Sequence, residues 1–170
     1  GRWIAFTSKD DESSEIKKKK KDGFDMIVMG DEQLYNRLWI YDVETKSHET
    51  MFRQDLNVSL FEWSDDSKFI AFQAAEKVNT DIEYLESSIY IVKAPNGNPR
   101  KISETPGKLS NMSISPNSEQ LVYLGATSYN DPLAQSIFVH NINNGKSKLI
   151  TPGFKESFVA VSYTHLRAQE

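Results

Sequence analysis

Residues 61–72 read Phe61-Glu62-Trp63-Ser64-Asp65-Asp66-Ser67-Lys68-Phe69-Ile70-Ala71-Phe72, and this stretch decides the fold. A segment of mixed apolar and polar residues leads into a polar turn, and a continuously apolar segment follows. Residues 111–124 repeat this order as Asn111-Met112-Ser113-Ile114-Ser115-Pro116-Asn117-Ser118-Glu119-Gln120-Leu121-Val122-Tyr123-Leu124. A third apolar segment, Trp3-Ile4-Ala5-Phe6, aligns with the other two, so that Ile4 and Ile70 match Val122.

Each apolar segment is followed, after a loop of variable length, by a second apolar strand, at residues 38–41, 89–92 and 137–140. A polar hairpin and a short outer strand come next. Asn96-Gly97 and Asn144-Gly145 are strong hairpin signals, because both residue types tolerate the positive φ that tight turns need. The repeated unit therefore contains four short strands.

The spacing of the repeats locates an insertion in the first of them. Ile4 and Ile70 are 66 residues apart, whereas Ile70 and Val122 are 52 apart. The excess lies near residues 9–23, which include the run Lys17-Lys18-Lys19-Lys20-Lys21. Acidic residues flank this run on both sides and cancel its field, so we expect a solvated loop or a short surface helix rather than a nucleic-acid or lipid patch.

A period of about 50 residues with four strands per period is typical of a β-propeller. We therefore expect an all-β fold of about three four-stranded antiparallel blades over residues 1–161. Blades cover each other's faces, which explains apolar strands that do not alternate; a β-sandwich would not explain the repetition in register. Because propellers have about four to eight blades, three cannot close a ring, and we expect a fragment of a larger protein.

Composition and charge narrow the classes of function. The formal net charge of -4 gives no electrostatic footprint for nucleic acid or anionic lipid, and no apolar run approaches the length of a membrane-spanning helix. The absence of cysteine excludes disulfides and thiolate metal sites. We expect a soluble protein without cofactor or metal, and the sequence leaves cytoplasm and periplasm open.

Beyond the repeats, the chain resembles the N-terminal propeller of the prolyl oligopeptidase family of serine peptidases, in its acylaminoacyl-peptidase and dipeptidyl-peptidase-like branch. The residues that carry the resemblance are Asn36-Arg37-Leu38-Trp39-Ile40-Tyr41-Asp42 after a strand Met26-Ile27-Val28, the stretch 61–72, and a third region from Pro99 to Phe154 with its Thr-Pro-Gly segments. The family's usual turn, Ser-Pro-Asp-Gly, lacks its glycine here. The turn-and-strand motif is shared with all TolB-like propellers.

The resemblance implies a C-terminal α/β-hydrolase domain that carries the catalytic Ser, Asp and His and hydrolyses short peptides. Its nucleophile elbow needs Gly-x-Ser-x-Gly. In this sequence only Gly145-Lys146-Ser147 begins that pattern, and it fails at Leu149. We therefore expect no catalytic residue in this chain, with the hydrolase domain as its missing partner and a peptide as substrate. The alternatives are a non-catalytic TolB-like binding propeller and a propeller fused to an amidohydrolase.

Few residues are candidates for a site. In related peptidases, propeller acids help to hold the positively charged N-terminus of a substrate, and Asp81, Glu83 and Glu86 are the candidates here, against a plain polar loop. The three histidines, His48, His140 and His165, have no metal spacing. Residues 162–170 fit no blade; they resemble adaptor-derived read-through, and we expect them to lie outside the fold.

Overall fold

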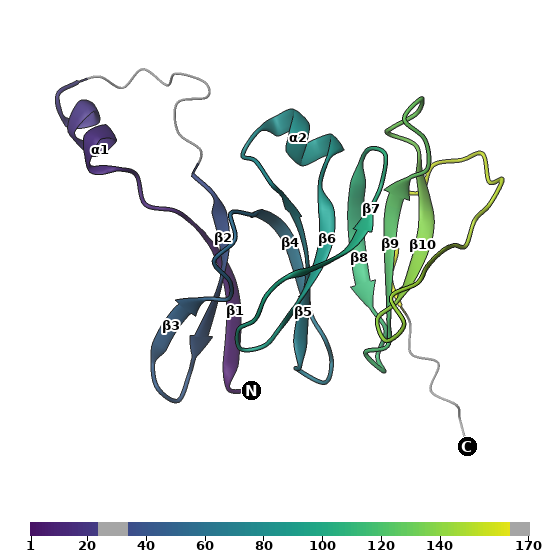
Figure 1. Ribbon diagram of the computed structural model, residues 1–170, viewed down its shortest axis with the longest axis horizontal. Coiled ribbons are helices and arrows are strands. Elements are labelled where there is room, and N and C mark those ends of the chain that lie inside the picture. Colours follow the sequence, from purple (N-terminus) through teal and green to yellow (C-terminus); the bar gives the residue numbers. More distant parts are fainter. Residues whose placement is uncertain (24–33, 164–170) are drawn as a thin grey trace.

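The computed structural model describes residues 1–23 and 34–163. Its strands form three antiparallel sheets that lie side by side in chain order (Figure 1). The first sheet contains β1 (Trp3–Lys9), β2 (Asn36–Asp42) and β3 (Ser47–Thr50). The second contains β4 (Asn57–Trp63), β5 (Phe69–Ala75), β6 (Ser88–Lys93) and β7 (Arg100–Glu104). The third contains β8 (Leu109–Ile114), β9 (Gln120–Ala126), β10 (Gln135–Asn141) and β11 (Ser147–Leu149).

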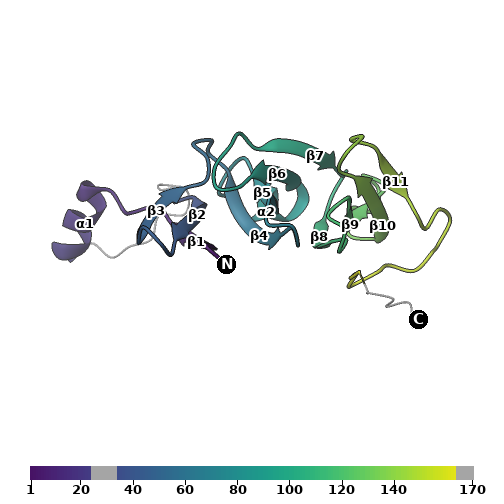
Figure 2. The same ribbon diagram turned by 90° about the horizontal axis from the view of Figure 1, so that it is seen from below.

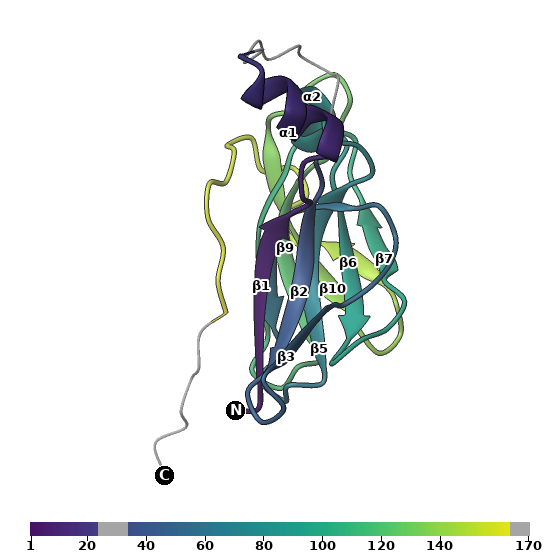
Figure 3. The same cartoon turned by 90° about the vertical axis from the view of Figure 1, so that its left-hand side faces the viewer.

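In each of the three sheets, every strand pairs with its neighbour in the sequence. Seen from below, the sheets follow one another in a row (Figure 2), and a view along this row superposes their strands (Figure 3). This confirms the predicted all-β fold and the four-stranded unit in the second and third sheets. The first sheet has three strands in the described residues, which correspond to the second, third and fourth strands of the other two.

Two apolar cores separate the sheets. The core between the first and second sheets contains Leu38, Ile40, Ile70 and Phe72. Phe72 is fully buried and stacks on Phe52 and Tyr90, with ring centroids 5.0 and 5.3 Å apart. The other core lies between the second and third sheets and is built from Phe69, Ala71, Ile89, Leu121 and Tyr123. The strand β5 therefore contributes side chains to both cores, which explains its continuously apolar sequence.

The alignment predicted for the second and third repeats is wrong by one residue. The turn before β5 closes through Ser64 N to Phe69 O (3.0 Å), and the turn before β9 closes through Ser115 N to Gln120 O (2.8 Å). Ile70 therefore corresponds to Leu121, not to Val122. A one-residue slip moves every side chain to the opposite face of a strand. Because both strands are apolar on both faces, their own residues show no alternation that could reveal the slip, but the spacing of 51 residues between Ser64 and Ser115 does reveal it.

The turns themselves use serine where the resembling family has glycine. Ser67 and Ser118 adopt φ of 58° and 57°, the left-handed conformation that favours glycine. In the first turn, Asp66 Oδ1 accepts hydrogen bonds from Ser64 Oγ (2.8 Å) and Lys68 N (3.1 Å). These bonds lower the pKa of Asp66, the contact with Ser64 contributing most. The acidic pair at 65–66 is thus part of the turn structure.

The charged insertion forms a short surface helix, α1 (Ser14–Lys21). Of the two predicted alternatives, a solvated loop and a short surface helix, the structure has the helix. Ser13 Oγ caps its N-terminus by accepting from Ile16 N (3.3 Å). No residue of this helix is buried, and Lys19 and Lys20 pair with Glu15 and Glu12. The predicted strand at 26–28 lies outside the described residues, as do residues 164–170 of the predicted tail.

Candidate functional site

The long connections of all three sheets lie at one end of the molecule (Figure 1). They follow β1, β5 and β9, and their described residues are 10–23 with 34–35, 76–87 and 127–134, whereas the opposite end carries only short turns among the described residues. We call the first of these ends the loop end. Connections that vary in length on a rigid scaffold are where proteins place binding residues. The loop end is therefore the place to look for a site.

Polar contacts tie the first sheet's connection to its neighbours at the loop end. Arg37 binds Asp10 through Nε (2.6 Å) and Asp55 through Nη2 (2.8 Å), and these bonds raise its pKa further above its ordinary value. Tyr35 Oη donates to the carbonyl oxygen of Glu76, 3.2 Å away on the second sheet. These contacts fix the start of β2 against the connections around it.

The connection after β5 contains a short helix, α2 (Thr80–Leu85). Asn79 Oδ1 caps it by accepting from Asp81 N (3.0 Å) and Ile82 N (3.2 Å). Asp81 and Glu83 stand in its first turn, where a carboxylate is stabilised by the helix dipole, and Glu86 caps its C-terminus. The three predicted acids thus share one helix, which the sequence presented as a polar loop.

A hollow of about 780 Å³ lies beside α2 at the loop end. Of the three predicted acids, only Glu86 lines it; Asp81 and Glu83 do not. Glu76 and Lys101 face each other across 3.9 Å, and Tyr129, which is 86% exposed, forms another part of the wall. The remaining lining residues are Lys77, Ile82, Leu85, Ser87, Ser88, Thr105 and Pro106.

The chemistry of this hollow suits a peptide. The carboxylate of Glu86 can bind an ammonium group, whereas Glu76 already pairs with Lys101. Ser87 Oγ donates to Glu83 O and Thr105 Oγ1 donates to Gly107 O, and both hydroxyl oxygens can still accept a hydrogen bond from a peptide N–H.

The sequence did not predict Glu76, Lys101 or Tyr129. Glu76 follows β5 and Lys101 lies on β7 of the same sheet, whereas Tyr129 comes from the connection after β9, which the packing of the second sheet against the third brings to the hollow.

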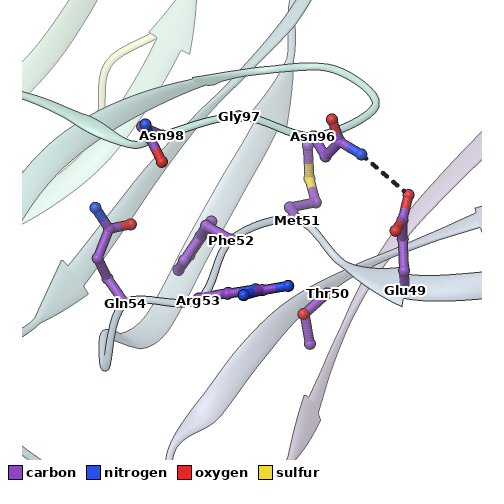
Figure 4. A pocket seen from close by; sticks show the side chains of 9 residues that line it. All are labelled: Glu49, Thr50, Met51, Phe52, Arg53, Gln54, Asn96, Gly97 and Asn98. Atoms are coloured by element: carbon purple, nitrogen blue, oxygen red, sulfur yellow. Dashed lines mark hydrogen bonds between the residues drawn. The ribbon is translucent and has the colours of Figure 1, made fainter.

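A second hollow, of about 640 Å³, lies between the connection after β3 and the hairpin after β6 (Figure 4). Gly97 N donates to Met51 O (3.2 Å), and Asn96 Nδ2 donates to Glu49 Oε1 (3.2 Å), which joins the two segments on one side. Figure 4 shows Gln54 and Asn98 on the other side. This hollow is lined by none of the predicted residues.

One serine contacts a histidine in the described residues, and the pair is structural. Ser147 Oγ lies 2.9 Å from His140 Nδ1, and the two residues face each other across β10 and β11. The other ring nitrogen, Nε2, is buried without a hydrogen-bond partner in the described part of the chain, so nothing orients the ring as a general base. Burial, together with the charge of Arg100, lowers the pKa of His140 and keeps it neutral at pH 7.

Residues 1–23 and 34–163 contain no cluster of three or more His, Asp or Glu side chains that could hold a metal ion. In the same residues, no helix has the length and apolar character that crossing a membrane requires.

Comparison with known proteins gives the fold. No protein-family model matches the chain, and no curated protein sequence matches it. The β-propeller domain of the trilobed protease from Pyrococcus furiosus superposes with a TM-score of 0.58 at 15% identity, over 86% of this chain and 38% of that one. The tricorn protease gives 0.55 at 22% identity, over 69% of this chain and 11% of that one. TolB from Acinetobacter baumannii gives 0.51 at 20% identity, over 74% and 28%.

The chain spans well under half the length of each of these three structures. At these identities the likeness concerns the fold. The three sheets stand as sheets of β-propellers do, in agreement with the TolB-like propeller that the repeats predicted, and the chain has the fold of a β-propeller domain.

Proposed function

We propose that the three sheets are consecutive blades of the propeller of a serine peptidase of the prolyl oligopeptidase family. In this proposal an α/β-hydrolase domain of the same protein carries the Ser, Asp and His, and the propeller restricts access to short peptides. The chain contributes geometry and substrate contacts rather than the catalytic groups.

The observation that carries the proposal is the hollow beside α2 at the loop end. It offers the carboxylate of Glu86 at the end of the sheets where the long connections gather. An ammonium group bound by a carboxylate is a charge-assisted contact, which is stronger than a neutral hydrogen bond. The propellers of the trilobed protease and the structure of the tricorn protease support a protease setting.

The complete protein encoded by the gene tests this function. Glu86→Gln should raise KM several-fold for peptides with a free N-terminus and leave KM for N-acetylated peptides unchanged. Asp81→Asn is the matched control, because Asp81 lies on the same helix but does not line the hollow. Equal effects of both variants, or an equal effect on acetylated peptides, would contradict the role of Glu86.

The second candidate is a non-catalytic TolB-like propeller that binds a protein partner. The superposition with TolB from Acinetobacter baumannii favours it. The two functions separate in one experiment, since a fluorophosphonate probe labels the active serine of a serine peptidase. Labelling of the complete protein supports the peptidase, and absence of both labelling and peptide turnover supports the binding propeller.

A further inference from the structure

One face of α2 forms part of the wall of the hollow at the loop end (Figure 1). Ile82, Leu85 and Glu86 all line this hollow, and they stand at positions i, i+3 and i+4, which lie on one side of a helix. Asp81 and Tyr84 do not line it. Leu85 is 36% exposed, so its apolar surface is open to solvent. The helix thus presents two apolar side chains beside one carboxylate.

The connection after β9 contributes an aromatic side chain to the same hollow. Tyr129 is 86% exposed, and hydrogen bonds on both sides of it hold this connection in place. Asn130 N donates to Ser128 Oγ (3.1 Å), and Lys108 N, in the connection after β7, donates to Pro132 O (2.8 Å). A large aromatic surface therefore stands at a defined place and is open to solvent.

Lys108 joins these two parts of the wall. Its backbone N–H binds the connection after β9, and its ammonium group lies over the ring of Tyr84 on α2, with Nζ 5.3 Å from the ring centroid. The preceding residue, Gly107, lies so close to Pro132 that a Cβ there would be 2.5 Å from the carbonyl oxygen of Pro132. The helix α2 and the connection after β9 are therefore both fixed to one short segment.

The charges in the hollow leave one carboxylate for a ligand. Glu76 and Lys101 lie 3.9 Å apart and balance each other. Glu86 forms no ion pair in the described part of the chain. Lys77, the other cation of the hollow, can donate to a carbonyl oxygen. The volume of about 780 Å³ is within the range of about 300–1,000 Å³ of sites that hold small ligands.

These features match the first residue of a peptide better than an internal residue. The first residue carries an ammonium group, a side chain and a carbonyl group on one Cα atom. Glu86 can accept from the ammonium group and Lys77 can donate to the carbonyl oxygen, while the apolar wall can cover an apolar side chain. A small or charged first side chain would leave Leu85 and Tyr129 in contact with water.

We propose that this hollow binds peptides whose first residue has a large apolar or aromatic side chain. The selection rests on the proposed function, in which Glu86 holds the ammonium group of a substrate. Ile82, Leu85 and Tyr129 then contact the side chain of the first residue and distinguish it from smaller ones. Full burial of a Leu or Phe side chain favours binding by about tenfold to a hundredfold, so the selection is large enough to measure.

Two ligands that differ only in their first residue test this selection. The complete protein encoded by the gene is first treated with a fluorophosphonate, which blocks turnover, and calorimetry then gives Kd for Phe-Ala amide and Gly-Ala amide. We expect the Phe ligand to bind about tenfold more tightly. Tyr129→Ser should reduce this ratio to about threefold or less. Leu133→Ser is the matched control, because Leu133 is 52% exposed in the same connection but does not line the hollow.

Two results would overturn the selection and leave the peptidase untouched, provided that the fluorophosphonate labels the serine. One is an equal Kd for the two ligands, or no binding of either. The other is a ratio that changes by the same factor, or not at all, in Tyr129→Ser and Leu133→Ser. Both side chains are exposed, so both variants should fold. A tenfold preference in a protein that the fluorophosphonate does not label would support the peptide site and contradict the peptidase.

Discussion

The guanidinium group of Arg2 binds both carboxylate oxygens of Asp42. Arg2 Nη2 donates to Oδ2 (2.7 Å), and Arg2 Nε lies 3.2 Å from each oxygen. Asp42 ends β2 and also accepts from the backbone N–H groups of Glu44 (2.9 Å) and Thr45 (3.4 Å), which closes the turn into β3. The hydrogen bonds from Arg2 are the main cause that lowers the pKa of Asp42 to about 2.

This contact predicts acid sensitivity. Because the folded pKa lies below the ordinary value of 3.8, the contribution of Asp42 is fully present above pH 4 and is lost as the pH falls toward 2. Urea unfolding of wild type and Asp42→Asn at intervals from pH 5 to pH 2 measures it, and the variant should show a shallower loss. Asp11→Asn, at a fully exposed carboxylate, should follow the wild type. An equal slope for Asp42→Asn would contradict the assignment.

The buried His140 predicts a second pH range, higher than that of Asp42, in which the stability of the fold changes. The pKa of His140 is lowered in the fold, so the unfolded chain binds a proton first as the pH falls through about 6.5, and stability decreases below that pH. Val92 occupies the equivalent position in β6, and His140→Val should remove this decrease while stability at pH 8 changes by about 1 kcal/mol or less. Thermal unfolding of wild type and His140→Val at pH 8 and pH 5.5 measures this effect. If Tm falls by the same amount between pH 8 and pH 5.5 in both proteins, His140 is not the cause of the decrease.

The turns predict a stabilising substitution. The left-handed conformation costs an L-residue about 1–2 kcal/mol in steric strain, which glycine avoids. Glycine gives back part of this gain, because it loses more conformational entropy on folding. Ser67→Gly should therefore raise the free energy of unfolding by about 0.5–1 kcal/mol. Ser118→Gly should gain less, since Ser118 Oγ accepts a hydrogen bond from Asp66 N (3.4 Å) that glycine cannot replace. Chemical denaturation ranks the two, and a loss of stability in Ser67→Gly would contradict the explanation.

Gly107 lies so close to Pro132 at the loop end that a larger residue there should destabilise the fold. A Cβ on Gly107 would lie 2.5 Å from the carbonyl oxygen of Pro132, which also accepts a hydrogen bond from Lys108 N (2.8 Å). Gly107→Ala should cost about 1–3 kcal/mol of stability, in the range of overpacked sites. Gly97→Ala is the control, because its Cβ would make ordinary contacts of 3.5 Å with Lys93. Similar unfolding free energies for the two variants would contradict this prediction, because they would show that residues 127–134 move at little cost to make room for the added Cβ.

Much of the fold could be predicted from the sequence because the turns carry local information. Ser64 to Lys68 and Ser115 to Glu119 form equivalent turns, and their spacing gave the repeated unit. The same spacing, 51 residues from Ser64 to Ser115, places Ile70 on Leu121, whereas the apolar strands themselves, buried on both faces, have no polar side that marks the register. The first sheet has three strands in the described residues, where the repeat predicted four.

The candidate site could be predicted only in part. Glu86 was identified because it lies in a long acidic connection, and it lines the hollow. Asp81 and Glu83 belong to the same stretch, but the helix α2 holds them in its first turn, away from that hollow. Lys101 lies on β7, and the pairing of β7 within the second sheet brings it to the hollow. Tyr129 belongs to the third sheet, so its proximity to Glu86 depends on the packing of two sheets, and no local pattern in the sequence encodes it.

In the proposed function, the loop end of this propeller controls which peptides reach a peptidase centre. The most direct test compares kcat/KM of the complete protein for two substrates, a short peptide and an unfolded polypeptide that contains the same cleavage sequence. We expect the short peptide to be preferred by at least about a hundredfold, and we expect the preference to fall in a variant in which a short turn replaces residues 11–22. Equal kcat/KM for the two substrates, in both proteins, would contradict the claim.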